Sequence, residues 1–271
     1  LLKQGREILQ NAGIAEWDLD AWYLLEYVTG VSRSQYFLDP EREVPQEQEV
    51  AYRQMIDKRS THIPLQHLTG HQEFMGLEFY VNEHVLIPRQ DTETLVELVL
   101  EEQKEKNKKL LDLCTGSGCV IVSILHNVSD VEGYAVDISK QALNVAKENA
   151  RLNDVPVLFE HSDLFDHVTG TFDVIVSNPP YICTDEIAKL MPEVRDFEPM
   201  EALDGKEDGL YFYRKIIGQC KQYLNPEGHL LFEIGYDQGQ KVSALMREIG
   251  FHDVQVIKDL ARKDRVVTGM L

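Results

Sequence analysis

The chain has 271 residues and a formal net charge of −19, from 46 acidic and 27 basic side chains. Such a charge repels polyanions, so stable binding to DNA is not expected. The hydrophobic content of 43% supports packed cores rather than disorder, and the length suffices for two domains. No run of about 18 apolar residues occurs, which predicts no membrane span, and no signal peptide is visible.

Cysteine and histidine usage indicates a cytoplasmic protein that holds no metal ion. The four cysteines show no C-x-x-C pairing, which is typical of reduced cytosolic thiols. His67 and His71 are four positions apart, but they straddle the turn signal Thr69-Gly70 instead of sharing a helix face. We therefore predict no metal site.

Residues 1–75 have a helical pattern and are predicted to form a small N-terminal helical bundle. The stretch Leu19–Val28 carries apolar residues at helical spacing, and residues 47–60 indicate another helix. Three aromatic residues are interpreted as bundle core rather than as a partner surface: Trp22, Tyr23 and Tyr27.

Residues 76–90 contain short apolar runs between turn signals, consistent with a β-hairpin linker. From residue 91 to 271, helical and strand patterns alternate, which predicts a Rossmann-like, doubly wound α/β domain with a mostly parallel seven-stranded sheet. The last two strands have no helix between them, which suggests an antiparallel edge strand. The expected strands are residues 109–113, 133–137, 156–161, 172–177, 229–234, 253–258 and 265–270. The expected helices are residues 91–104, 118–126, 139–152, 208–223 and 237–249.

A loop of small residues follows the first strand of this domain and precedes an apolar helix. Gly116 and Gly118 let the backbone approach a ligand, and the helix N-terminus behind them offers free N–H groups. Because Val120-Ile121 does not supply the third glycine of a dinucleotide fingerprint, another nucleoside-type ligand is favoured. The residues expected to bind it are Cys114, Thr115, Gly116, Ser117 and Gly118.

Two carboxylates follow at the ends of the next two predicted strands. Asp137 lies roughly 20 residues past the glycine loop, where an acidic residue suits a ribose diol. Asp163, with Leu164 beside it, is placed to accept a hydrogen bond from an adenine amino group.

The turn Asn178-Pro179-Pro180-Tyr181 follows a buried strand and suits the binding of a planar –NH2 group. Asn178 offers an amide oxygen, and the prolines lack N–H groups, so that backbone carbonyls can face a ligand. Tyr181 offers a flat face for stacking. A plain strand-ending turn is the alternative interpretation, but glycine loop, carboxylates and turn occur in order at four successive strand ends.

These motifs resemble those of class I S-adenosylmethionine-dependent methyltransferases over residues 86–271. More narrowly, the chain is similar to the PrmC (HemK) family, protein-(glutamine-N5) methyltransferases that act on peptide chain release factors. Besides the Asn-Pro-Pro-Tyr turn, this narrower likeness rests on residues 68–93, 194–199 and 232–235. Gln90 replaces a second proline of many members, and Cys114 replaces a glycine. Because cysteine is small, its position is not expected to need a positive φ.

The resemblance implies S-adenosylmethionine as the cofactor and the glutamine in the Gly-Gly-Gln loop of class I release factors as the methyl acceptor. It implies that Asn178 Oδ1 and the Pro179 carbonyl orient the glutamine nitrogen, with Tyr181 packed against the amide plane. Residues 1–75 would then be a substrate-docking domain. Other residues expected at the substrate are Leu86, Arg89 and Pro180.

Two alternative functions stay open on sequence grounds. Adenine-N6 and other amine methyltransferases use the same turn, but the acidic charge disfavours a DNA substrate. The lysine-rich stretch 104–109 is interpreted as a helix end and solvated loop, not a nucleic-acid patch. A non-catalytic cofactor-binding module is disfavoured by four intact residues: Asn178, Tyr181, Gly116 and Asp137.

Overall fold

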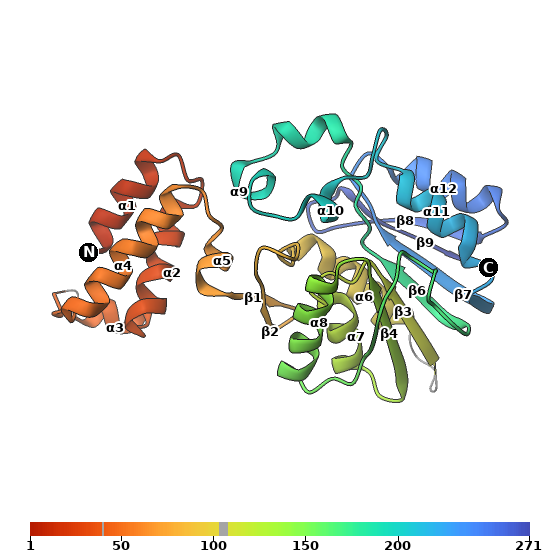
Figure 1. Ribbon diagram of the computed structural model, residues 1–271, viewed down its shortest axis with the longest axis horizontal. Coiled ribbons are helices and arrows are strands. Elements are labelled where there is room, and N and C mark those ends of the chain that lie inside the picture. The colour runs from red at the N-terminus through yellow and green to blue at the C-terminus, as the bar shows by residue number, and fades with distance from the viewer. Residues whose placement is uncertain (40, 103–107) are drawn as a thin grey trace. The chain divides into compact units, whose positions relative to one another are not determined.

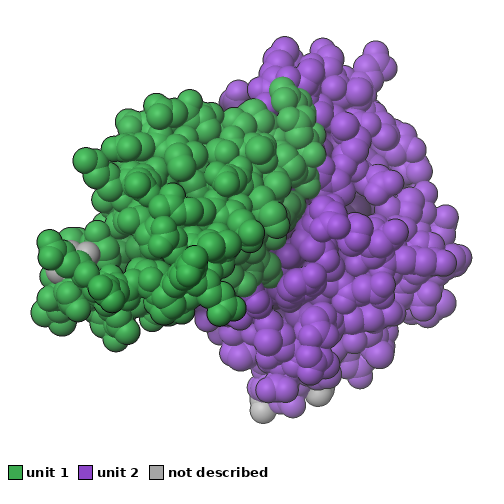
Figure 2. Space-filling view, turned by 60° about the vertical axis from the view of Figure 1, so that its left-hand side comes forward, with its two compact units in different colours: residues 1–70, 191–197 green, residues 71–190, 198–271 purple. Residues whose placement is uncertain are grey.

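The computed structural model describes residues 1–39, 41–102 and 108–271, which form two compact units (Figures 1 and 2). Unit 1 comprises residues 1–70 and 191–197, and unit 2 comprises residues 71–190 and 198–271. Positions 104–107 of the lysine-rich stretch lie outside the described residues, and they include the predicted helix end at 104.

Unit 1 is built from helices packed around a small core. Its helices are α1 (Leu2–Asn11), α2 (Trp17–Thr29), α3 (Arg33–Leu38), α4 (Gln46–Ser60), α5 (Leu65–Thr69) and α9 (Pro192–Arg195). A Cβ on Gly5 would lie 2.1 Å from the Tyr52 hydroxyl, so glycine is what lets α1 and α4 approach. That hydroxyl donates to the Ala21 carbonyl at 3.1 Å. Because Tyr52 is buried, it links three helices in the core.

The aromatic residues of α2 divide between the core and the surface. Trp22 is 3% exposed, as predicted. Tyr23 and Tyr27 are 49% and 53% exposed, so the prediction that they belong to the core is wrong. Apolar spacing alone did not distinguish the buried stripe of this helix from the residues beside it.

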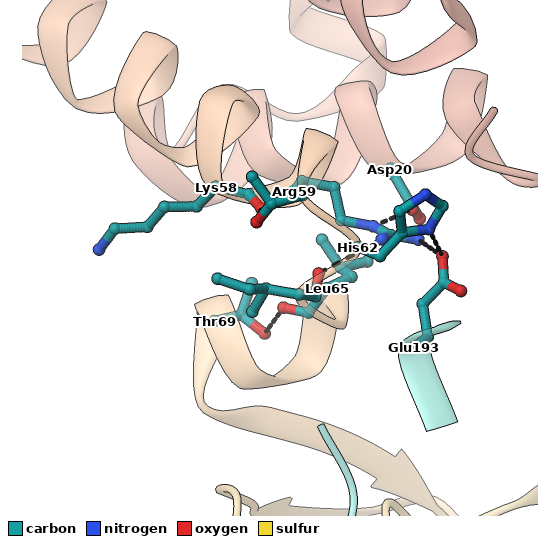
Figure 3. A network of polar contacts seen from close by, with 9 residues as sticks. Asp20, Lys58, Arg59, His62, Leu65, Thr69 and Glu193 are labelled. Carbon is teal, nitrogen blue, oxygen red and sulfur yellow. Dashed lines mark hydrogen bonds and ion pairs between the residues drawn. The ribbon is translucent and has the colours of Figure 1, made fainter. Parts of the chain in front are cut away.

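A buried guanidinium joins the helices of unit 1 to the segment 191–197 (Figure 3). Arg59 donates to Asp20 at 2.8 Å and to Glu193 at 3.1 Å. His62 contacts the same Glu193 oxygen at 3.0 Å. Burial raises the pKa of Asp20, whereas Arg59 opposes that rise. For Glu193, burial is outweighed by hydrogen bonds from its own backbone, His62 and Arg59, which lower the pKa.

Unit 2 contains a seven-stranded sheet of order β5-β4-β3-β6-β7-β9-β8 and a separate β1–β2 hairpin. The strands are β1 (His71–Phe74), β2 (Leu77–Tyr80), β3 (Lys108–Leu113), β4 (Val131–Asp137), β5 (Leu158–His161), β6 (Phe172–Ser177), β7 (Leu224–Glu233), β8 (His252–Lys258) and β9 (Asp264–Met270). The first five strands of this order pair in parallel, and β9 runs antiparallel to β7 and β8. The predicted fold class is confirmed. The antiparallel pairings lie at one end of the sheet, where β9 pairs with β7 and with the edge strand β8.

The helices of unit 2 are η1 (Gln90–Thr92), α6 (Glu93–Glu102), α7 (Cys119–Asn127), α8 (Lys140–Leu152), η2 (Thr184–Lys189), α10 (Met200–Leu203), α11 (Tyr211–Cys220) and α12 (Gly239–Glu248). The longer helices cover both faces of the sheet, with α6, α7 and α8 on one face and α11 and α12 on the other (Figure 1). Ile175 of β6 packs in the cluster formed with α11 and α12. Val174 and Val176 pack in the cluster formed with α6 and α7. This alternation is what a strand buried on both faces requires. Within the described residues, no helix is both long and apolar enough to cross a membrane.

Candidate active site

A cavity of about 320 Å³ lies where β3, β4, β5 and β6 end. These four strands are parallel neighbours, so their carboxyl ends meet at one edge of the sheet. Chain order reverses between β3 and β6, and open α/β sheets bind ligands at such a switch point. The predicted site residues that line the cavity are Leu86, Arg89, Cys114, Thr115, Gly116, Ser117, Asp137, Asp163, Leu164, Asn178 and Pro180. Among the described residues, Gly118, Pro179 and Tyr181 are site predictions that do not form its lining.

The glycine loop connects β3 to α7 and is held by the carboxylate at the end of β4. The Gly116 N–H donates to Asp137 Oδ2 at 2.9 Å, and the Ser139 N–H donates to Oδ1 at 2.8 Å. Gly116 has φ +55°, and a Cβ at this position would meet no atom within 4 Å. The backbone of the loop therefore faces open space in the cavity.

The expectation that Cys114 needs no positive φ is wrong, because its φ is +59°. This conformation favours glycine, so the cysteine carries backbone strain. Burial raises the pKa of its thiol, which keeps it protonated and unreactive.

Three carboxyl groups beside the loop differ in exposure: Asp112 is buried, Asp137 is half-buried and Asp163 is exposed. Asp112 is 1% exposed, and burial raises its pKa to about 7, although a hydrogen bond from Thr115 Oγ1 opposes the rise. Burial also raises the pKa of Asp137, which the N–H groups of Ser139 and Gly116 lower. Asp163, after β5, is exposed. Its neighbour Leu164 is buried, with φ +51°.

The Asn178 turn leaves β6 and is supported from behind by buried polar groups. Asn178 Nδ2 donates to Thr92 Oγ1 at 3.5 Å, which leaves Oδ1 as a free acceptor of this amide. The Tyr181 hydroxyl donates to Glu233 Oε1 at 3.5 Å. Gln238 Nε2 donates to the Tyr181 carbonyl at 3.1 Å and fixes the far end of the turn.

Arg89 lines the cavity and is paired with a buried carboxylate. Its Nη2 donates to Glu198 Oε1 at 2.6 Å, and the Ile87 N–H donates to the same oxygen at 3.3 Å. Burial raises the pKa of Glu198, and Arg89 lowers it. The guanidinium is thus oriented by a residue more than a hundred positions away, which no local sequence signal could reveal.

Sequence reasoning also missed residues that hold the site together. Asn149 of α8 is fully buried and donates to the Ser117 carbonyl at 2.8 Å and the Tyr80 carbonyl at 3.0 Å. It connects the glycine loop to the β1–β2 hairpin. Thr92 and Glu233 belong to stretches that carry the family resemblance, which is the one signal that marked them. The described residues include no group of three or more His, Cys, Asp or Glu placed to hold a metal ion.

Comparison with known proteins first defines the class. Residues 90–192 match the methyltransferase small domain family, and residues 1–70 match the PrmC N-terminal domain family. A methyltransferase of known structure from Pyrococcus furiosus has the same fold, with a TM-score of 0.54 and 17% identity over 72% of this chain and 89% of that one. With its cavity at the strand ends, the protein is a methyltransferase.

Closer relatives define the family. A release factor glutamine methyltransferase from Clostridium botulinum is 43% identical, over 98% of this chain and 96% of the relative. One from Agrobacterium fabrum is 40% identical, over 97% and 93%. The chain belongs to the family of release factor glutamine methyltransferases.

Proposed function

We propose that this enzyme transfers a methyl group from S-adenosylmethionine to the side-chain amide nitrogen (N5) of the glutamine in the Gly-Gly-Gln loop of class I peptide chain release factors. One observation carries the proposal: the glycine loop and the Asn178 turn line the same cavity. A cofactor on the first would bring its reactive group to an acceptor on the second. Action on release factors would occur in the cytoplasm.

The residues at the cavity fit this cofactor. The open space over Gly116 admits a ligand against the backbone, and the Asp137 carboxylate suits its ribose hydroxyls. Residues 114–118 would contact the remainder of the cofactor's nucleoside. Asp163 and Leu164 would contact its adenine. When bound, the cofactor supplies an electrophilic methyl group on a sulfonium, so no acid is needed for its leaving group.

The acceptor amide needs orientation because its nitrogen lone pair is delocalised into the carbonyl. Asn178 Oδ1 and the Pro179 carbonyl would each accept one N–H of the glutamine side chain. This holds the nitrogen in line with the methyl group and favours loss of planarity as the new C–N bond forms. Once the new C–N bond has formed, the nitrogen is cationic and strongly acidic, and it releases one proton to water. Tyr181 and Pro180 would pack against the amide plane, with Leu86 and Arg89 on the substrate side.

Asp173 is not a candidate base for that proton. Its two oxygens accept hydrogen bonds from the Lys109 N–H and from Asn225 Nδ2, both at 2.7 Å. These contacts tie β6 to its neighbours. Positioning and fixed dipoles would then make the main catalytic contributions.

Two features support a protein substrate that docks on the enzyme. The net charge of −19 favours a basic partner, such as a domain that faces ribosomal RNA, mainly through the association rate. The exposed rings of Tyr23 and Tyr27 on α2 support a docking role for the N-terminal region, which was predicted as residues 1–75.

Methylation assays on matched substrates test the proposal. Intact release factor and adenine-containing DNA are each incubated with the enzyme and tritiated S-adenosylmethionine. Label on release factor alone is the expected result. Label on DNA alone would replace the proposal with adenine-N6 methylation, and binding of the cofactor without any transfer would indicate a non-catalytic module.

A further inference from the structure

Two buried polar side chains stand behind the catalytic turn, and neither is an expected substrate or cofactor ligand. Thr92 of η1 and Glu233 at the end of β7 are each 2% exposed. Thr92 Oγ1 accepts from Asn178 Nδ2, and Glu233 Oε1 accepts from the Tyr181 hydroxyl. Glu233 Oε2 is buried and accepts no hydrogen bond among the described residues, and the nearby Thr92 hydroxyl lowers the pKa of the Glu233 carboxyl. We infer that the Thr92 hydrogen is directed to this carboxyl, which links Asn178 through Thr92 and Glu233 to Tyr181.

This series of contacts determines which end of the Asn178 amide faces the cavity. A hydroxyl has one hydrogen to donate, and an ionised carboxylate can only accept. If the Thr92 hydrogen is directed to Glu233, only lone pairs of Oγ1 face Asn178. The amide must then turn its –NH2 to Thr92, which leaves Oδ1 toward the acceptor. The opposite orientation would present –NH2 to the –NH2 of a glutamine, and two donors do not pair.

We propose that Thr92 and Glu233 are positioning residues, which fix the Asn178 amide with its oxygen toward the methyl acceptor. The inference rests on the proposed methyl transfer, because it assigns a role in orienting that acceptor. The inference adds two residues that act through Asn178. Thr92 lies in the cavity wall beside Asn178, and Glu233 lies outside the cavity lining.

The protonation state of Glu233 determines whether this orientation holds. Burial raises its pKa to about 7, against hydrogen bonds from Thr92 and Tyr181 and the charge of Arg265. The other titratable groups around it are Asp91 of η1, Tyr213 of α11 and Cys119 of α7. A protonated Glu233 can donate to Thr92, which frees the threonine hydrogen to attract Asn178 Oδ1. The productive orientation is therefore present above this pKa and is lost as the pH falls through it.

Isosteric variants test the proposal in the full-length enzyme with intact release factor. Thr92→Val removes the hydroxyl and keeps the shape, and it should lower kcat by about 10- to 100-fold, less than the removal of a transition-state hydrogen bond altogether. The affinity for S-adenosylhomocysteine should stay within about threefold. Thr92→Ser restores a hydroxyl and should recover most of the loss. Thr268→Val is the matched control, since Thr268 is buried on β9 and its hydroxyl has no partner among the described residues.

The pH dependence of kcat tests Glu233. The wild-type kcat should fall below about pH 7, and Glu233→Gln should remove this acidic limb because the amide does not titrate in this range. A Thr92→Val enzyme with kcat within twofold of wild type would overturn the proposal, as would an acidic limb that persists in Glu233→Gln. If Thr92→Val does not fold, the profiles of Thr92→Ser and Glu233→Gln decide the matter. Absence of transfer by the wild-type enzyme would refute the proposed function instead.

Discussion

Arg59 and Glu193 are 134 positions apart in the chain, yet the guanidinium of one donates to the carboxylate of the other at 3.1 Å. The same guanidinium pairs with the buried Asp20 at 2.8 Å. Because Arg59→Met would leave Asp20 buried without its partner, it should lower the free energy of unfolding by about 3–5 kcal/mol.

Glu193→Gln is the matched comparison for this prediction. It keeps an oxygen that can accept from Arg59, and the side chain is 19% exposed, so the loss should be about 1 kcal/mol. Both tryptophans of the chain, Trp17 and Trp22, belong to unit 1. Their fluorescence during urea unfolding therefore reports on this unit. Equal losses in the two variants would contradict the central role given to Arg59.

Asp137→Ala should weaken the binding of S-adenosylhomocysteine by about 1.5–3 kcal/mol, the scale of a charge-assisted hydrogen bond. The change removes the proposed ribose acceptor and the group that holds the Gly116 N–H. Isothermal titration calorimetry measures the loss. Glu132→Ala is the control, because Glu132 is an exposed acid on the same strand, β4. Unchanged affinity in Asp137→Ala would remove Asp137 from the ribose role.

The parts of the site that follow strand ends could be predicted from sequence, and the parts made by tertiary packing could not. Gly116, Asp137 and Asn178 lie at consecutive ends of one parallel sheet, so the alternating pattern sufficed to bring them together. Thr92 and Glu233 meet them from η1 and β7, and only the packed fold creates those contacts.

Backbone conformation and long-range assembly were equally invisible in the sequence. Cys114 adopts φ +59°, a conformation that residue type argues against. The short helix α9 gives too weak a pattern to be predicted, and its inclusion in unit 1 depends on contacts such as that between Arg59 and Glu193. Tyr23 and Tyr27 have core-like spacing but lie at the surface.

Glu233→Gln should be more stable than the wild-type protein, and this advantage should be larger at pH 8 than at pH 5. Burial raises the pKa of Glu233 from 4.5 to about 7, so between these values the folded state holds a proton that the unfolded state has lost. Wild-type stability therefore falls as the pH rises through this window. Glutamine avoids the buried charge, and its advantage over wild type should grow by about 2–3 kcal/mol from pH 5 to pH 8. Urea unfolding followed by circular dichroism at both pH values tests this. If the advantage of the glutamine variant does not change with pH, folding does not raise the pKa of Glu233, and the prediction is wrong.

Intact release factor should be methylated far better than a short peptide that carries the same Gly-Gly-Gln loop, and this advantage should shrink as salt rises. The net charge of −19 attracts a basic partner over distances that salt screens. Initial rates for both substrates from low to high sodium chloride measure the effect. Equal rates at every salt concentration would mean that docking by the rest of the partner is unimportant.

In the proposed reaction, the Asn178 turn orients a glutamine amide for methylation. Mass spectrometry of intact release factor tests this role, after reaction with wild-type and Asn178→Ala enzymes at saturating cofactor. Asn127→Ala is the control, because within the described residues the side-chain amide of Asn127 donates only to the Ser123 carbonyl. One added methyl group is expected on the glutamine of the Gly-Gly-Gln loop. For Asn178→Ala, kcat should be about a hundredfold or more lower, with little change in cofactor affinity. Wild-type turnover by Asn178→Ala, or a methyl group at another position, would contradict it.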